Sequence, residues 1–367
     1  VEAAASTGGQ IMPPIMGAAA FIMAEMTGYE YSDIIVRAIL PAFLYFLGIF
    51  LGVHFKAKKL GLVGLKREEL PKWKLLLPKI YLLLPLIILT WMVIAGQTMA
   101  KSAIYGTIVA IAVGIINKDD RMTPTKFVNG LENGGKNCLS IGIACGIAGI
   151  ISVCITMTGL GGLLITYVVK LSNGHLFIAL FLTMICCIIL GMGVPTTANY
   201  IIMASTCAPI LINGMGMHIL AANMFVFYFG IVADITPPVA LAAYAGAAIA
   251  KAPPMKTALN ATRLAIAAFI IPYIFAYNNA MIFVGDVTFL GVTSIVISAT
   301  LGMASIASGF MGYLIHDLKW YSRIALIAGG LLMVIPGTVT DLAGLAILIV
   351  ILLIQRAENK KEKKAAV

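Results

Sequence analysis

Runs of apolar residues long enough to cross a lipid bilayer recur along this sequence, for example at residues 31–53, 258–277 and 287–315. About 20 apolar residues span the hydrocarbon core as a helix. Hydrophobic residues make up 61% of the chain and charged residues only 11%, against about 25% in soluble domains. The sequence therefore predicts an all-α, polytopic integral membrane protein.

Basic residues gather in short segments between the apolar runs. The chain has 25 Lys and Arg against 15 Asp and Glu, a formal net charge of +10. Lysines dominate residues 56–79 and 360–364, and further basic residues mark 117–126 and 251–256. Because cytoplasmic loops of membrane proteins are enriched in Lys and Arg, we predict that these segments face the cytoplasm, with 56–79 lying along the membrane surface. This pattern follows membrane topology, so no nucleic-acid partner is expected.

Helix-breaking residues interrupt the apolar pattern at three places, which we name the first break (residues 8–14), the tip (191–199) and the second break (234–238). Glycine and proline stop a helix, because Gly adds backbone freedom and Pro lacks an N–H. A broken backbone persists in lipid only where protein, ions or water satisfy its polar groups. We therefore predict that the tip joins two legs, 174–190 and 198–212, of a re-entrant hairpin. The alternative is a kinked structural helix.

An internal repeat relates the two breaks. Ile11 to Ile15 aligns with Ile235 to Val239 at an offset of 224 residues (237 − 13), and each copy continues into a small-residue helix and a full span. The loop after the first copy is acidic, whereas the loop after the second carries Lys251 and Lys256. The positive-inside rule then places the copies in opposite orientations. Inverted repeats with paired helix breaks are typical of transporters that work by alternating access around a central site.

The breaks and the tip supply the candidate binding groups. Half-helix N-termini present free N–H groups to anions, and unwound carbonyls and side-chain oxygens suit a hard cation such as sodium. The candidate substrate- and ion-binding residues are Gly9, Gln10, Met12, Pro13, Gly191, Met192, Gly193, Val194, Pro195, Thr196, Thr197, Asn199, Asp234, Thr236 and Pro237. The candidate sodium ligands among them are Gly9, Gly193, Thr196, Asn199, Asp234 and Thr236. Asp234 is the only acid deep in these elements and is a functional candidate for that reason, the alternative being a water-exposed Asp.

The sequence gives no sign of an enzyme. It contains no GxSxG or HExxH motif and no phosphate-binding GxxxxGK[ST] loop. Its six cysteines form no CxxC pair and its four histidines are scattered, so no transition-metal cluster is expected. We predict no cofactor, with sodium serving only as the coupling ion.

Three motifs, in this order along the chain, resemble those of the large membrane subunit of tripartite ATP-independent periplasmic (TRAP) transporters. They are Gly8 to Pro14, Leu190 to Ala198, and Phe225 to Ala242 with its Ile235-Thr236-Pro237-Pro238. The resemblance covers residues 1 to about 280 and is closest to the form in which the small and large subunits are fused. Residues 285–364 resemble a C-terminal extension found in some fused members.

The resemblance implies an elevator-type symporter in the inner membrane of a bacterium or archaeon. Sodium and an organic acid would bind between the tip and the broken helices, and a periplasmic substrate-binding protein would deliver the substrate. Asp234 departs from the family pattern, which usually has a small or neutral residue there. Two alternatives remain at this point: a single-component sodium/dicarboxylate-type carrier, which needs no soluble partner, and a non-transporting membrane scaffold.

Four regions follow from these patterns. We predict the second half of repeat one at 1–55, a basic interfacial segment with two spans at 56–136, repeat two at 137–284, and a C-terminal extension with further spans and a basic tail at 285–367. The sequence begins within a helical pattern at Val1. We therefore expect it to be the C-terminal part of a longer polypeptide that carries the first hairpin.

Overall fold

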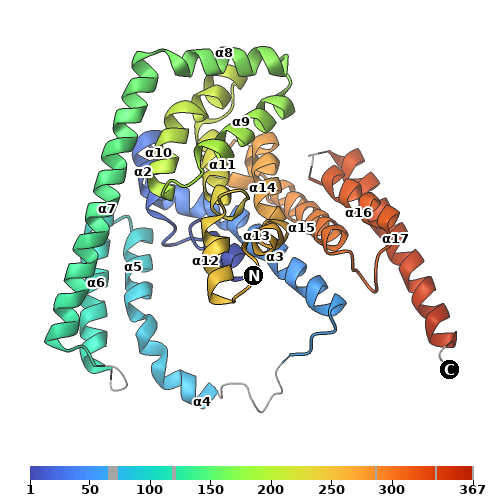
Figure 1. The fold of residues 1–367 in the computed structure, drawn as a ribbon, viewed down its shortest axis with the longest axis horizontal. Coiled ribbons are helices and arrows are strands. Elements are labelled where there is room, and N and C mark those ends of the chain that lie inside the picture. Colours follow the sequence, from blue (N-terminus) through green and yellow to red (C-terminus); the bar gives the residue numbers. More distant parts are fainter. Residues whose placement is uncertain (65–72, 118–120, 286, 335–336, 366–367) are drawn as a thin grey trace.

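The computed structural model describes residues 1–64, 73–117, 121–285, 287–334 and 337–365. Within these ranges the chain forms helices and turns, with no strand (Figure 1). Helices long and apolar enough to cross a membrane cover 31–59, 77–94, 254–277, 289–311 and 338–358, and shorter apolar helices lie between them. The predicted all-α, polytopic membrane fold is confirmed.

The first broken helix consists of α1 (Glu2–Gly8) and α2 (Ala18–Thr27), and α3 (Tyr31–Lys59) follows it. The second consists of α11 (Ile219–Val232), the 3-10 turn η4 (Ala233–Ile235) and α12 (Leu241–Ile249), and α13 (Pro254–Leu264) and α14 (Ile266–Tyr277) follow. The helices therefore stop where Gly and Pro interrupt the sequence pattern. The order of half-helix, break, half-helix and full span is the same in both copies.

Backbone geometry repeats with the same offset of 224 residues. Met16 has φ +55° and Ala240 has φ +38°, both in the left-handed region that non-glycine residues seldom adopt (16 + 224 = 240). The carbonyl of Pro14 accepts a hydrogen bond from the Tyr31 hydroxyl at 3.0 Å, and the corresponding carbonyl of Pro238 accepts one from Tyr244 at 2.6 Å. In each break a tyrosine therefore satisfies a carbonyl freed from the helix.

The core surrounds α11, whose residues from Leu220 to Val232 are all buried. Its large side chains, including Phe225 and Phe229, pack against α14 and against the hairpin. Helices α3 and α14 approach closely, because a Cβ on Gly48 would lie 2.5 Å from the Cβ of Ala267. These contacts fix the second break in the middle of the molecule.

The hairpin is made of α9 (Leu176–Leu190) and α10 (Thr196–Thr206), followed by a short π-helix, η3 (Ile210–Gly214). Helix α8 (Leu160–Ser172) lies across one end of the molecule (Figure 1). Because η3, which follows the second leg of the hairpin, packs against both α8 and the first leg α9, the end of the hairpin lies beside its beginning. The segment is thus a re-entrant hairpin and not a kinked helix.

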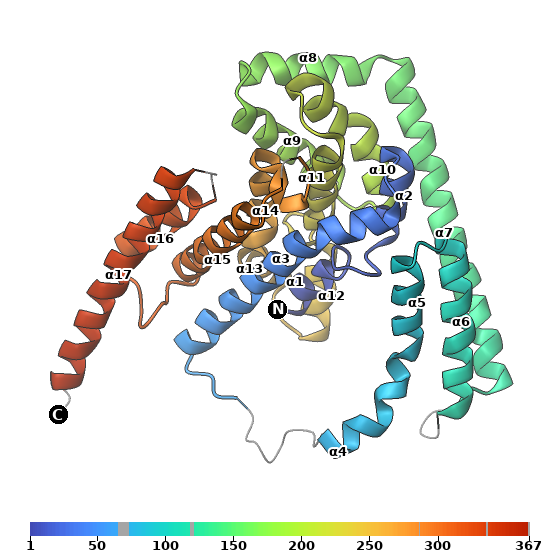
Figure 2. The same cartoon turned by 180° about the vertical axis from the view of Figure 1, so that it is seen from behind.

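A peripheral arm consists of α4 (Trp73–Leu76), η2 (Leu77–Leu83), α5 (Leu84–Ile94), α6 (Met99–Ile116) and α7 (Pro124–Met157) (Figure 2). Within this arm α5 packs against α6. Helix α7 runs through the proposed region boundary at 136–137. The middle of the predicted amphipathic segment, 65–72, lies outside the described residues, as do 118–120.

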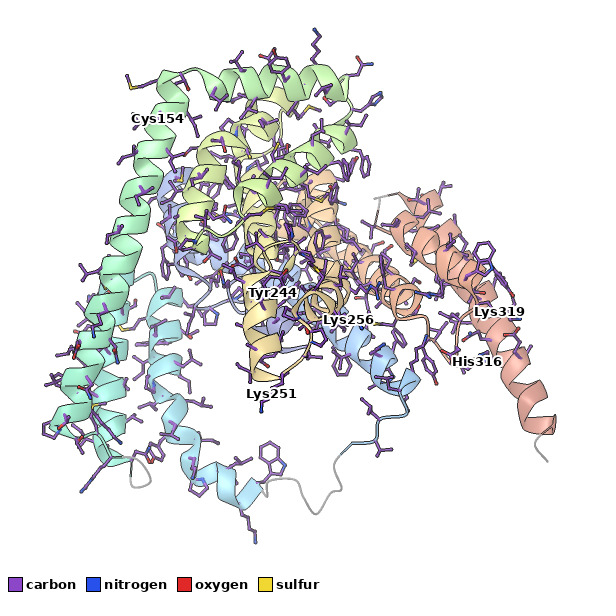
Figure 3. All side chains as sticks on the ribbon, viewed as in Figure 1. Cys154, Tyr244, Lys251, Lys256, His316 and Lys319 are labelled. Carbon is purple, nitrogen blue, oxygen red and sulfur yellow. The ribbon has the colours of Figure 1, made fainter. Side chains whose placement is uncertain are left out.

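The C-terminal extension forms α15 (Phe289–Met311), α16 (Trp320–Leu332) and α17 (Thr338–Ala365). Helix α15 packs against α3, and α16 packs against α15 and α17. The C-terminus, α4 and Lys251 all lie at the end of the molecule opposite α8 (Figures 1 and 3). This arrangement agrees with the prediction that the basic segments share one side of the membrane.

Candidate functional site

The tip is a non-helical turn between two helix ends. Helix α9 ends at Leu190 and α10 begins at Thr196. Gly193 within the turn has φ +75°, and the space around it is open, since a Cβ there would meet only Val239 Cγ1, at 4.0 Å. Glycine is needed at this position for its backbone conformation and not for lack of room. Because Val239 follows the second break, the tip lies beside that break.

Asn199 attaches the hairpin to α11. It is fully buried, and its Nδ2 donates a hydrogen bond to the carbonyl of Gly230 at 3.1 Å. A Cβ on Gly191 would lie 2.7 Å from Asn199 Nδ2 and 2.8 Å from the Cβ of Ala233. Gly191 is therefore the residue that lets the tip come this close to η4. The structure thus brings the tip and the second break together, as the sequence predicts.

The first break, the tip and the second break each carry a side-chain oxygen without a hydrogen-bond donor. Asn199 Oδ1 and Gln10 Oε1 are buried and have no hydrogen-bond partner. Within the part of the chain that the structure describes, the half-buried Asp234 carboxylate also has no hydrogen bond or ion pair. An unpaired buried acceptor costs about 1–3 kcal/mol. Unsatisfied oxygens from the first break, the tip and the second break are the donor set that a hard cation prefers.

Half-helix ends of both polarities meet at the breaks. The C-terminal ends of α1, α9 and α11 and the N-terminal ends of α10, α12 and α2 all lie at breaks in the chain. A helix N-terminus carries about half a positive charge and free N–H groups, and a C-terminus carries the opposite charge and free carbonyls. The region can accordingly offer carbonyls to a cation and N–H groups to a carboxylate.

The first break reaches this region through α1, which packs against η4, α12 and α13. A cavity of about 10 Å³ lies between the two breaks and is lined by Thr7, Ile11, Tyr45, Tyr228, Ile231, Val232 and Ala268. This volume is about the space of one water-sized probe. The cavity admits a single water or ion and no organic acid. The buried Tyr228 hydroxyl has no hydrogen-bond partner, although this tyrosine lines the cavity.

Burial divides the predicted site residues into three groups. The buried ones are Gly191, Thr197 and Asn199. The half-buried ones are Gln10, Pro13, Met192, Val194, Thr196, Asp234, Thr236 and Pro237. The exposed ones are Gly9, Met12, Gly193 and Pro195. The hydroxyl of Thr236 donates to the Val232 carbonyl at 2.8 Å, so it offers a cation only its oxygen lone pairs.

Sequence reasoning missed the α11 side of this interface. A Cβ on Gly230 would lie 3.2 Å from Met203 Sδ and 3.4 Å from Asn199 Nδ2, so this glycine lets α10 pack closely. The buried Tyr200 hydroxyl donates to Asn223 Oδ1 at 2.8 Å, a second polar link between α10 and α11. Asn199 and Asn223, which lie within apolar helices, were the available sequence signal for contacts between α10 and α11, because buried amides require hydrogen-bond partners.

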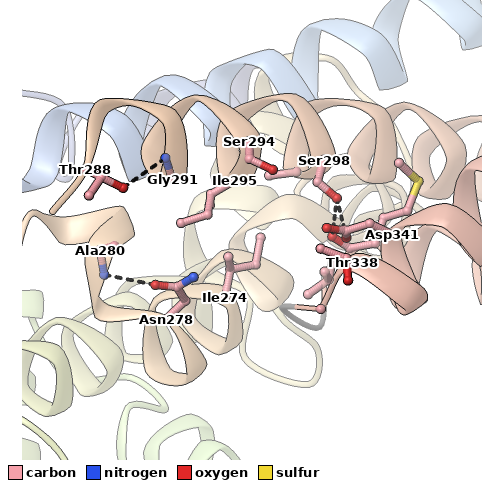
Figure 4. Close-up of a pocket in the computed structure, with 14 residues that line it drawn as sticks. Ile274, Asn278, Ala280, Thr288, Gly291, Ser294, Ile295, Ser298, Thr338 and Asp341 are labelled. Carbon is pink, nitrogen blue, oxygen red and sulfur yellow. Dashed lines mark hydrogen bonds between the residues drawn. The ribbon is translucent and has the colours of Figure 1, made fainter. Parts of the chain in front are cut away.

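A second, more polar pocket lies at the extension, between α14, α15 and α17 (Figure 4). It has a volume of about 470 Å³, and the Asp341 carboxylate in it accepts a hydrogen bond from the Ser298 hydroxyl at 2.6 Å. Among the described residues that line it, none is basic. A carboxylate substrate would meet like charge there, so this pocket is a poorer candidate than the tip and the breaks.

Comparison with known proteins gives one family. The sequence model described as "Tripartite ATP-independent periplasmic transporter, DctM component" matches residues 1–290. No curated protein and no solved structure matches the chain. The matched range contains both breaks and the hairpin and ends just after the start of α15. The resemblance predicted from the three motifs is thereby confirmed.

Proposed function

The chain belongs to the DctM component family of tripartite ATP-independent periplasmic transporters, and from this premise we propose that it is a permease subunit that imports an organic acid by sodium symport. The family consists of transporters, so the chain moves a solute and catalyses no reaction. We place it in the cytoplasmic (inner) membrane of a bacterium or archaeon. The family description and the basic segments on one side support this placement.

The sodium proposal rests on the orphan oxygens, by which we mean the side-chain oxygens of Gln10, Asn199 and Asp234 that lack hydrogen-bond donors. Asn199 Oδ1 is fully enclosed by protein, and Asn199 Nδ2 is already used in the bond to Gly230. A sodium ion would give Asn199 Oδ1 the partner that it lacks. Asp234 would add a full negative charge from the other side of the same interface, and nearby backbone carbonyls would complete the shell.

The half-helix N-termini support the organic-acid proposal. Helices α10, α12 and α2 each begin at a break and leave backbone N–H groups unpaired by the helix. Such groups bind carboxylates without a basic side chain. Sodium at the C-terminal ends and a carboxylate at the N-terminal ends would neutralise one another, which favours binding of both together.

The family name specifies a three-part system, and we propose that a periplasmic substrate-binding protein and a small membrane subunit complete it. A single-component sodium/dicarboxylate carrier would work without them. Uptake in cells that lack the binding protein separates the two: loss of uptake supports the tripartite transporter, and unchanged uptake supports the single-component carrier. A non-transporting scaffold would give no uptake in either strain.

Sodium binding is tested by substituting one asparagine and comparing a matched one. Asn199→Leu removes the orphan oxygen and keeps a side chain with the same branching and the same number of heavy atoms. Asn223→Leu makes the same change at another buried asparagine, whose oxygen accepts from Tyr200 and whose nitrogen donates to the Ile219 carbonyl. The measurement is the thermal unfolding midpoint of the purified full transporter in sodium chloride and in potassium chloride.

For the wild type, a saturating sodium concentration about 100 times the dissociation constant stabilises the folded state by about 2.7 kcal/mol. We expect Asn199→Leu to lose this sodium-specific increase while changing the midpoint in potassium little, because it removes an unpaired acceptor along with one hydrogen bond. Asn223→Leu should lower the midpoint in both salts and keep the difference between them. A full sodium-specific increase in Asn199→Leu would remove Asn199 from the ion site.

A further inference from the structure

A basic pocket of about 250 Å³ lies where the family-matched part of the chain meets the C-terminal extension. Helices α3, α13 and α15 lie side by side there in both views, and α16 packs against α15 (Figures 1 and 2). The basic side chains that line the pocket are Lys56, Lys59, Arg263 and Arg323. They come from three different helices, so tertiary packing and not sequence proximity brings these charges together.

Two of these basic residues have a structural role at the C-terminal end of α15. Arg323 Nε donates to the Gly309 carbonyl at 2.9 Å, and Lys59 Nζ donates to the Gly312 carbonyl at 3.3 Å. Lys59 also forms an ion pair with Asp317 at 3.2 Å. These bonds satisfy carbonyls that the helix end leaves free. They explain why Arg323 and Lys59 are present without invoking a ligand.

The other two are not explained in this way. Within the part of the chain that the structure describes, the side chains of Lys56 and Arg263 have neither a hydrogen-bond partner nor an ion-pair partner. Four cations face one carboxylate, Asp317, and a helix C-terminus that adds about half a negative charge. A surplus of more than two positive charges therefore remains in one concave site. Like charges that line one pocket repel one another, and an anion bound between them would offset this repulsion.

Besides Asn260, the rest of the pocket is lined by an apolar wall formed by Leu264, Phe310 and Met311. A small free anion gains nothing from such a wall, whereas an amphiphile buries its glycerol and acyl carbons against it. The pocket also lies toward the side of the molecule that carries the other basic segments, which we predict to be cytoplasmic. Basic pockets between transmembrane helices on that side suit phospholipid head groups.

We propose that this pocket binds the phosphate of an anionic phospholipid, with Lys56 and Arg263 as its charge partners. The guanidinium of Arg263 can hold two phosphate oxygens at once, and the Lys56 ammonium adds a point charge. The lipid would bridge α3 and α13 of the family core to α15 of the extension. The extension would then have a physical role, because it completes a lipid site that the matched residues form only in part.

The test compares two double variants that remove equal charge from the same side of the protein. Lys56→Gln/Arg263→Gln changes the pocket. Lys251→Gln/Lys256→Gln, the loop variant, changes the loop after α12 and the first turn of α13, and neither lysine lines the pocket. The purified full transporter is placed in nanodiscs that contain phosphatidylcholine with or without phosphatidylglycerol. After extraction into detergent, native mass spectrometry counts the retained lipids. A separate titration uses inorganic phosphate as the probe.

We expect the wild type and the loop variant to retain phosphatidylglycerol in preference to phosphatidylcholine, and the pocket variant to lose this preference. Each basic residue near an anionic lipid contributes about 1 kcal/mol, so two removed charges correspond to about a 30-fold weaker affinity. Binding of inorganic phosphate to the wild type without selective retention of phosphatidylglycerol would overturn the lipid assignment. Equal retention of phosphatidylglycerol by both double variants would overturn the site itself.

Discussion

Gly191→Ala tests whether close approach of the hairpin to the second break is required for sodium binding. A Cβ at this position would lie 2.7 Å from Asn199 Nδ2, 2.8 Å from Ala233 Cβ and 3.0 Å from the carbonyl oxygen of Cys187. These neighbours are a buried amide, a methyl group on η4 and backbone. None of them is the end of a long flexible side chain that could turn away. To admit the methyl group, the tip must therefore rearrange and the hairpin must move away from Ala233.

Overpacking of this kind costs about 1–3 kcal/mol. The contacts with Asn199 and Cys187 lie within the hairpin, whereas the contact with Ala233 exists only when the hairpin is docked on η4. If sodium binds only to the docked form, the share of the cost that comes from Ala233 appears as weaker sodium binding. Since about 1.4 kcal/mol is a factor of ten, the sodium concentration for half-maximal uptake should rise by up to about 150-fold.

Gly246→Ala is the matched control, because Gly246 lies in α12 and a Cβ added there would have no neighbour within 4 Å. Uptake is measured in proteoliposomes with the complete transporter, as a function of sodium at saturating substrate and normalised to protein abundance. We expect Gly246→Ala to follow the wild-type sodium curve. If the Gly191→Ala curve also followed it at equal abundance, the docked hairpin would not be the sodium-binding form.

Two further predictions follow from the structure. Asp234→Asn should raise the sodium concentration for half-maximal uptake while leaving substrate affinity at saturating sodium nearly intact. The carboxylate has no other partner among the described residues, and opposite charges about 4 Å apart attract by about 4 kcal/mol at a dielectric of about 20. If the sodium titrations of the variant and the wild type overlapped, Asp234 would be removed from the site. Single cysteines at 251–256 should be shielded from an impermeant periplasmic thiol reagent and cysteines at 278–285 should react, and labelling of 251–256 from outside would contradict the inverted orientation of the repeats.

Local chemistry allowed much of the fold to be predicted. Gly and Pro end helices through their own backbone properties, so the breaks at 8–14 and 234–238 could be recognised without knowledge of the neighbours. The repeat offset of 224 likewise depends only on sequence, and the matching left-handed Met16 and Ala240 extend it to the backbone. The continuity of α7 across the proposed boundary at 136–137 was missed, because residues 124–136 are polar and the prediction relied on apolar runs.

The sequence predicted the residues of the candidate site on the tip and the breaks, but not the residues of α11 that contact them. Asn199 stands beside helix breakers, so its position gave a reason to select it. Gly230 lies within a continuous apolar helix. Nothing in the sequence distinguishes a glycine that allows another helix to pack closely against it from a glycine that only destabilises the helix in which it lies. Its role depends on Met203 and Asn199, which approach it only in three dimensions. The basic pocket was missed for the same reason, since Lys56 and Arg263 are more than 200 positions apart (263 − 56 = 207).

The division of the orphan oxygens between two elements gives sodium a way to control the hairpin. An ion shifts a conformational equilibrium only by its difference in affinity for the two states. If all its ligands came from η4, sodium would bind equally well with the hairpin docked or displaced, and it would bias neither. Asn199 lies on the hairpin and Asp234 lies on η4, and the hairpin contacts η4 at Gly191. A sodium ion held by both residues would exist only in the docked arrangement, so its binding energy would act directly on the position of the hairpin.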